Sequence, residues 1–118
     1  MGSIVGEKSF VFAVEIVKIV RELKKETREY ELLNQLMRSA TSIGANITEA
    51  EFAQSTRDYV SKFSIALKEA NETKYWLRLL NATGILPDNG FEILINGIDE
   101  LIRILVSIIK TTKQRNSL

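Results

Sequence analysis

Apolar and polar residues recur along this chain every three or four positions, which is the period of an α-helix. One proline and six glycines in 118 residues leave few positions that would interrupt helices. Because four such segments are joined by short connections, we predict one all-α domain over residues 1–118, an antiparallel up-down four-helix bundle. The predicted helices cover residues 9–25, 28–51, 55–82 and 91–112.

The two middle helices carry apolar stripes that predict the core of the bundle. The stripe of the second helix consists of Leu32, Leu36, Ala40, Ile43, Ile47 and Ala50. The stripe of the third helix, which has a break at Thr73, consists of Phe63, Ala66, Ala70, Leu77 and Leu80.

Several residues have side chains or backbone preferences that predict helix ends. Ser55 opens a capping-box pattern at the start of the third helix. Gly84 is suited to a left-handed helix stop, and Pro87 prevents the helix from continuing. We expect Asp88 or Asn89 to cap the fourth helix.

The first and fourth predicted helices are apolar around most of their circumference. Ten of the fourteen residues 10–23 are apolar, although a surface helix of a bundle needs an apolar stripe only somewhat over about 100° wide. We therefore predict a homo-oligomer, in which a second subunit covers the excess. The alternative is an apolar surface that stays exposed or is covered by the termini.

Composition excludes several classes of function. The chain has no histidine and no cysteine, which excludes Ser-His-Asp triads, HExxH zinc sites, Glu-x-x-His di-iron sites and thiolate chemistry. Its net charge of +1 gives no global signal for a polyanion or a membrane. No apolar run approaches the roughly 20 residues of a membrane span, and no secretory signal is recognisable. We expect a cytoplasmic protein without a membrane partner.

The second helix also carries a polar stripe, whose members are Gln35, Arg38, Ser42, Asn46 and Glu49. One interpretation is a site for a ligand, a metal or nucleic acid; the other is a polar network that fixes the contact with a neighbouring helix. Arg38 and Glu49 are about three turns apart and need partners on another helix, where Glu69 and Glu72 are available. We favour the structural network, whose predicted members are Arg38, Ser42, Asn46, Glu49 and Glu72.

A carboxylate metal site is the alternative use of the same side chains. Asn46, Glu49, Glu69 and Glu72 carry oxygen ligands suited to a divalent cation, and a carboxylate-metal nuclease would use such a cluster. Their spacing is not diagnostic of a metal site. We therefore expect no catalytic residue, no metal and no cofactor.

Basic residues gather at the C-terminal ends of two predicted helices. There they interact favourably with the helix dipole or could contact phosphates. A closed oligomer would repeat such a patch around a ring and strengthen binding to a polyanion. Tyr75 and Trp76 could stack on bases, but aromatic residues at helical spacing are more often core or interface. The candidate nucleic-acid contacts are Lys24, Lys25, Arg28, Lys110, Lys113 and Arg115.

The stretches "QLMRSATSIGANITEAE" and "YVSKFSIALKEANETKYWLRLLNATGIL" resemble the 23S rRNA-intervening sequence protein family, also called bacterial four-helix bundle proteins. The matching hallmark positions are Gln35, Leu36, Arg38, Ser42, Ile43, Asn46, Ile47 and Glu49, followed by Ala66 and Glu72. Many members have glycine at the position of Ala50, and a Gly-Ser pair at Lys68 and Glu69.

The resemblance implies an up-down bundle that assembles as a homopentamer, without enzymatic activity. A related group, the accessory proteins of diversity-generating retroelements, is similar and binds nucleic acid and a reverse transcriptase, although this chain lacks the strong basicity of that group. We expect a non-catalytic homo-oligomer that serves as an assembly module or binds RNA or a nucleic-acid-processing protein. The alternatives are a purely structural protein-protein scaffold and a carboxylate-metal enzyme.

Small residues in the same stretch have a structural interpretation. Ser39, Gly44 and Ala45 would let a neighbouring helix approach closely. We therefore expect Gly44→Leu to disrupt helix packing.

Overall fold

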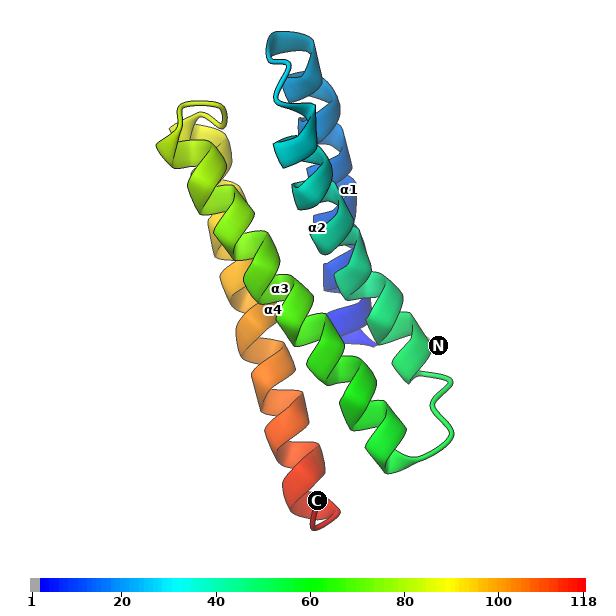
Figure 1. Cartoon of the computed structure of the whole chain (residues 1–118). Coiled ribbons are helices and arrows are strands. Elements are labelled where there is room, and N and C mark those ends of the chain that lie inside the picture. The colour runs from blue at the N-terminus through cyan, green and yellow to red at the C-terminus, as the bar shows by residue number, and fades with distance from the viewer. Residues whose placement is uncertain (1–2) are drawn as a thin grey trace.

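The computed structural model of the chain describes residues 3–118 and consists of four helices, with no strand in that range. The molecule is an elongated rod of 48 × 22 × 20 Å (Figure 1). The all-α, four-helix prediction is confirmed. The helices are α1 (Ile4–Glu26), α2 (Tyr30–Ala50), α3 (Thr56–Ala82) and α4 (Asp88–Arg115).

Each helix packs against the helix that follows it in the chain, and α1 also contacts α4. In Figure 1 the chain turns back at each connection between helices. The α2–α3 contact is the most extensive and the α1–α4 contact the least extensive. Around the bundle, α1 therefore lies diagonally opposite α3, and its two sides adjoin α2 and α4.

The first helix begins earlier than its predicted start at residue 9. Ser3 caps it, because its Oγ accepts a hydrogen bond of 2.9 Å from the Gly6 amide. The predicted cap of α3 is confirmed, since Ser55 Oγ accepts from the Asp58 amide at 3.0 Å.

The fourth helix begins at Asp88 rather than at residue 91, and it ends at Arg115 rather than at residue 112. Neither Asp88 nor Asn89 is its cap, because Pro87 occupies that position. The Asp88 carboxylate instead accepts a hydrogen bond of 2.8 Å from Asn81 Nδ2 on α3. The predicted left-handed stop after α3 is confirmed, with Gly84 at φ +81°.

The predicted apolar stripes form the core, with one correction. All five stripe residues of α3 are buried, and the α2 stripe is buried from Leu36 onwards. At the start of α2, Leu33 is fully buried and Leu32 is only half-buried. Within residues 3–118 no helix is both long and apolar enough to span a bilayer.

Candidate functional site

A cluster of polar side chains joins α2 to α3 near the middle of the bundle. Arg38 Nη1 donates to both carboxylate oxygens of Glu69 at 3.4 Å and also forms an ion pair with Glu72 through Nη2. Trp76 Nε1 donates to the same Glu72 carboxylate at 3.1 Å, and Gln35 accepts from Arg38 Nε at 3.4 Å. We call these five residues the Arg38 cluster.

The charged side chains Arg38 and Glu72 of the Arg38 cluster stabilise each other's ionised forms. The hydrogen bond from Trp76, followed by the interaction with Arg38, lowers the pKa of Glu72 below its ordinary value. The hydrogen bond to Glu72 raises the pKa of Arg38. Both side chains therefore stay ionised, so they suit an ion pair and not proton transfer near pH 7.

The other predicted members of the polar network do not join this cluster through their side chains. Ser42 Oγ donates to the Arg38 carbonyl oxygen at 2.7 Å, and Asn46 Nδ2 donates to the Ser42 carbonyl oxygen at 2.8 Å. Both bonds stay within α2. Glu49 reaches α3 separately, in an ion pair of 3.3 Å with Lys62. Of the five predicted residues, the structure brings together the Arg38 and Glu72 side chains.

A buried hydroxyl pair lies in the core between α2 and α3. Ser39 and Thr73 are both inaccessible to solvent, and their hydroxyl oxygens are 2.9 Å apart. Sequence reasoning did not identify this pair. Its only signal was the break in the apolar stripe of α3 at Thr73.

The carboxylates proposed as alternative metal ligands lie beside cations instead. Glu69 and Glu72 contact Arg38, and Glu49 contacts Lys62. Among residues 3–118 no group of three or more aspartate or glutamate side chains gathers in a geometry suited to a metal ion. The geometry of these side chains favours ion pairing between helices over metal binding.

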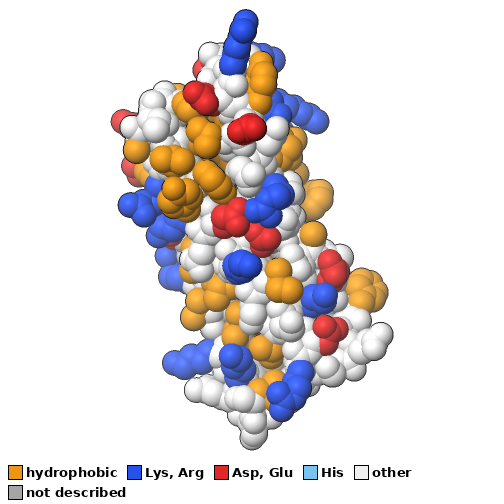
Figure 2. Space-filling view, in the orientation of Figure 1, with side chains coloured by type: hydrophobic (Ala, Val, Ile, Leu, Met, Phe, Trp, Pro, Cys, Tyr) orange, Lys and Arg blue, Asp and Glu red, His pale blue; other side chains and the backbone are white. Residues whose placement is uncertain are grey.

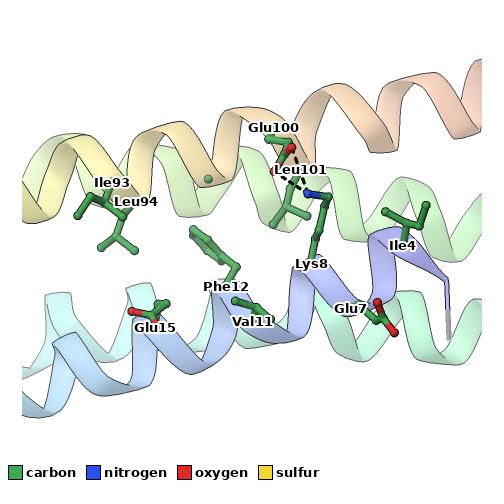
Figure 3. A pocket seen from close by; sticks show the side chains of 11 residues that line it. Ile4, Glu7, Lys8, Val11, Phe12, Glu15, Ile93, Leu94, Glu100 and Leu101 are labelled. Carbon is green, nitrogen blue, oxygen red and sulfur yellow. Dashed lines mark hydrogen bonds and ion pairs between the residues drawn. The ribbon is translucent and has the colours of Figure 1, made fainter.

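An apolar groove of about 500 Å³ lies between α1 and α4 (Figure 3). Phe12, Leu94 and Leu101 are its buried lining. Val11 and Ile93 lie on its rim with 60% and 70% of their surface exposed. The sequence indicated excess apolar surface on these two helices, but it gave no signal that they part to form a groove.

The charged groups along this groove are few and partly paired. Lys8 Nζ on α1 lies 3.3 Å from Glu100 on α4 and bridges the groove (Figure 3). Glu7 and Glu15 complete the charged lining. An apolar floor with a bridging ion pair suits the binding of an apolar surface better than catalysis.

The apolar surface continues around α1 to its contact with α2. Phe10, with 70% of its surface exposed, lies beside a second groove between these helices. Small residues line that groove on both helices: Gly6, Ser9, Ala13, Gly44 and Ala45. Exposed apolar residues of α1 thus lie beside both grooves, among charged residues of the same helix such as Glu7, Lys8 and Glu15.

The two sets of candidate nucleic-acid contacts lie at opposite ends of the rod. The first set, at the end of α1 and in the following loop, consists of Lys24, Lys25 and Arg28; the second, at the end of α4, consists of Lys110, Lys113 and Arg115 (Figure 1). In the first set, Lys24 donates to Asn34 at 2.6 Å and Lys25 pairs with Glu22 at 3.2 Å. One subunit cannot bring both sets to a single compact site.

Residues 2–107 match the model of a family described as 23S rRNA-intervening sequence protein. Among solved structures, the chain is similar to a protein of unknown function from the S23 ribosomal protein family of Bacteroides thetaiotaomicron. The two share 48% sequence identity with a TM-score of 0.88, and the match covers 91% of this chain and 99% of that chain. No curated protein gave a significant match. The similarity therefore extends over nearly the whole of both chains.

Proposed function

Because this chain belongs to the 23S rRNA-intervening sequence protein family, as its motifs predicted, we propose that it is a non-catalytic homo-oligomer that binds RNA. The subunit of this assembly is an antiparallel up-down bundle, and the expected oligomer is a pentamer in the cytoplasm. The similar protein from Bacteroides thetaiotaomicron is described as having unknown function, so the proposal rests on the surfaces of this chain.

The observation that carries self-assembly is the exposed apolar side of α1. Phe10 and Val11 expose 70% and 60% of their surface, and each lies beside a groove that could receive side chains of a second copy. Large apolar side chains exposed beside apolar grooves are typical of a protein interface. The grooves on both flanks of α1 give a neighbouring subunit places to insert its own apolar residues.

Solution mass tests this part of the proposal. We expect size-exclusion chromatography with light scattering to give five subunits of 13.4 kDa each. Phe10→Glu and Val11→Glu should shift the protein towards the monomer, because a carboxylate buried in an apolar interface costs several kcal/mol. Ile65→Glu is the matched control, since Ile65 is exposed on the opposite helix α3. A monomeric parent protein, or equal dissociation of the control, contradicts the proposed interface.

RNA binding is supported by basic side chains that have no acidic partner. Lys110, Lys113 and Arg115 belong to none of the ion pairs found among residues 3–118. A gel shift with structured RNA tests this function, and binding should weaken steeply with salt. Absence of a shift at low salt would favour the alternative, a purely structural protein-protein scaffold.

A further inference from the structure

The outward side of α3 carries basic, polar and aromatic side chains and no carboxylate. Every exposed residue of this helix is either neutral or basic. The basic, polar and aromatic residues of this side lie three, four or seven positions apart and so share one face of the helix. They are Arg57, Ser64, Lys68, Asn71, Tyr75 and Arg78.

Three of the carboxylates that border this face are paired with cations, whereas Asp58, in the first turn of α3, belongs to none of the ion pairs found among residues 3–118. On the side of α2, Glu69 and Glu72 contact Arg38. On the side of α4, Asp99 lies 2.7 Å from Lys74. Because Arg38 offsets only one of the two carboxylates on the side of α2, part of the charge of Lys68 is offset too, since Lys68 is near enough to help lower the pKa of Glu72. Arg57 and Arg78 belong to none of the ion pairs found among residues 3–118 and leave the outward side of α3 positive.

The second half of α4 extends the same surface. No acidic residue follows Glu100 in the sequence, whereas four basic residues do, and all four are exposed: Arg103, Lys110, Lys113 and Arg115. A groove lined by Thr56 and Tyr59 together with Thr112 and Asn116 places the start of α3 beside the end of α4. The exposed Glu51 also lines this groove and is the carboxylate nearest to this end of the surface in sequence before Asp58. Lys and Arg side chains gather over this part of the molecule in the lower part of Figure 2. We call the outward side of α3 together with residues 101–115 the α3–α4 basic face.

The opposite end of the rod is balanced in charge. Lys24, Lys25 and Arg28 lie in a segment, residues 21–31, that contains four basic and four acidic residues. The Lys25–Glu22 ion pair already uses one of these charges. Of the two sets of candidate nucleic-acid contacts, the charge distribution therefore favours the set on α4.

We propose that the α3–α4 basic face binds the sugar-phosphate backbone of single-stranded RNA, with Tyr75 stacking on an unpaired base. The proposal deepens the RNA-binding function proposed above and rests on it. Arg57, Lys68 and Arg78 are spaced about 15 Å apart along a straight helix, given a rise of about 1.5 Å per residue. Such a spacing follows an extended backbone and does not surround a small ligand.

Tyr75 distinguishes single-stranded nucleic acid from other polyanions. Tyr75 is 55% exposed, and its ring meets the ring of the half-buried Trp76 in an edge contact with centroids 5.1 Å apart. Trp76 thus steadies a solvent-exposed aromatic ring in the middle of a basic face. Stacking of an unpaired base on such a ring contributes to affinity without reading sequence.

The face is also compatible with the proposed assembly. Because α3 lies diagonally opposite α1 in the bundle, a subunit interface on the outward side of α1 leaves the outward side of α3 open to solvent. On α4, the groove beside α1 is lined no further than Leu101, so that Lys110, Lys113 and Arg115 lie beyond it. The test can therefore use the intact oligomer.

The test measures binding of a labelled, unstructured RNA of about 20 nucleotides by fluorescence anisotropy across a salt series. For Arg57→Gln/Lys68→Gln/Arg78→Gln we expect affinity at least about tenfold weaker at about 100 mM salt. The slope of log K against log salt should fall by about 2, since each lost phosphate contact on a single strand contributes about 0.7. All three residues are exposed, so helicity by circular dichroism should match the parent.

The matched control, Lys24→Gln/Lys25→Gln/Arg28→Gln, removes the same charge from the other end and should change affinity no more than about twofold. If it abolishes binding while the α3 variant binds normally, RNA binding stands and the assignment to this face is wrong. Equal losses in both variants would also overturn the assignment, because they would report net charge alone.

Tyr75→Ala should weaken binding without changing the salt slope, and Tyr75→Phe should restore it. If the triple α3 variant does not fold, Lys68→Gln and Arg78→Gln singly carry the same test, each with a slope change of about 0.7. A poly-glutamate peptide that competes as well as RNA would show a general anion surface and overturn the RNA assignment. A parent protein that binds no RNA at about 50 mM salt overturns the RNA-binding function itself.

Discussion

The contact between Gly44 of α2 and Ser9 of α1 allows a quantitative test of close helix packing. A Cβ atom added at Gly44 would lie 3.2 Å from Ser9 Oγ and 3.8 Å from Ser9 Cβ. The Ser9 side chain has little freedom to move away, because it is buried and its Oγ donates to the Gly6 carbonyl oxygen at 2.8 Å. The hydroxyl of Ser9 is thus the atom that a side chain introduced at position 44 would crowd first.

Two opposing terms decide the effect of Gly44→Ala. Alanine favours a helix interior over glycine by about 1 kcal/mol, and crowding of Ser9 Oγ should cost about the same. We therefore expect Gly44→Ala to leave the free energy of unfolding nearly unchanged in the parent protein. In a Ser9→Ala background the nearest remaining atom of residue 9 is an ordinary contact, so the same substitution should stabilise by about 1 kcal/mol.

The free energies of unfolding of the parent, the two single variants and the double variant form a double-mutant cycle, which urea unfolding monitored by circular dichroism measures. All four proteins are compared at one fixed concentration, because the protein is expected to associate. A coupling of about 1 kcal/mol corresponds to about 4 °C in Tm for a chain of 118 residues. Equal effects of Gly44→Ala in both backgrounds would refute the contact with Ser9 as the constraint. Gly44→Leu should destabilise by about 1–3 kcal/mol, and a Leu variant that melts like the parent would refute close packing there.

Two further predictions concern the contacts between α2 and α3. Thr73→Val should lower the free energy of unfolding by about 1–3 kcal/mol, because it removes the cross-helix partner of the buried Ser39 hydroxyl. The double variant Thr73→Val/Ser39→Ala should recover part of that loss in urea unfolding, and no recovery would contradict the pairing. The pKa of Glu72 is lowered in the folded protein by Trp76 and Arg38, so its ionised form contributes stability above the ordinary value of 4.5 and loses it as pH falls through the lowered pKa. The difference in unfolding free energy between the parent and Glu72→Gln should therefore be largest above pH 4.5 and shrink below it, and a pH-independent difference would argue against the charged pair.

Periodicity predicts the four helices well, because an apolar stripe that is buried along one side of a helix extends over many residues of the segment. Helix ends depend instead on single hydrogen bonds. Ser3 starts α1 early through its bond to the Gly6 amide. Asp88 was an obvious cap by residue type, but its carboxylate bonds to Asn81 instead. Such competition between a local and a tertiary partner is not encoded in residue spacing.

The candidate site was predictable only where charge alone determined the partner. Arg38 needed an acidic partner on the third helix, and Glu69 and Glu72 supply it. Ser42 and Asn46 share the same stripe, but their short side chains reach backbone carbonyl groups of their own helix first. A stripe therefore identifies the side that faces a neighbour, but not which of its members cross to it.

The diagonal placement of α1 and α3 relates assembly to binding. A net charge of +1 per chain is too small to predict a polyanion partner, but net charge averages over faces that need not act together. If the outward side of α1 meets neighbouring subunits, its mixed charges become part of the interface, and each subunit presents the α3–α4 basic face to solvent. A closed ring would then repeat this face around its outside and bind one RNA strand at several points, with an affinity above that of any single face. Affinity for a long RNA should accordingly fall when Phe10→Glu dissociates the oligomer, although Phe10 lies on the helix opposite α3, beside the groove between α1 and α2.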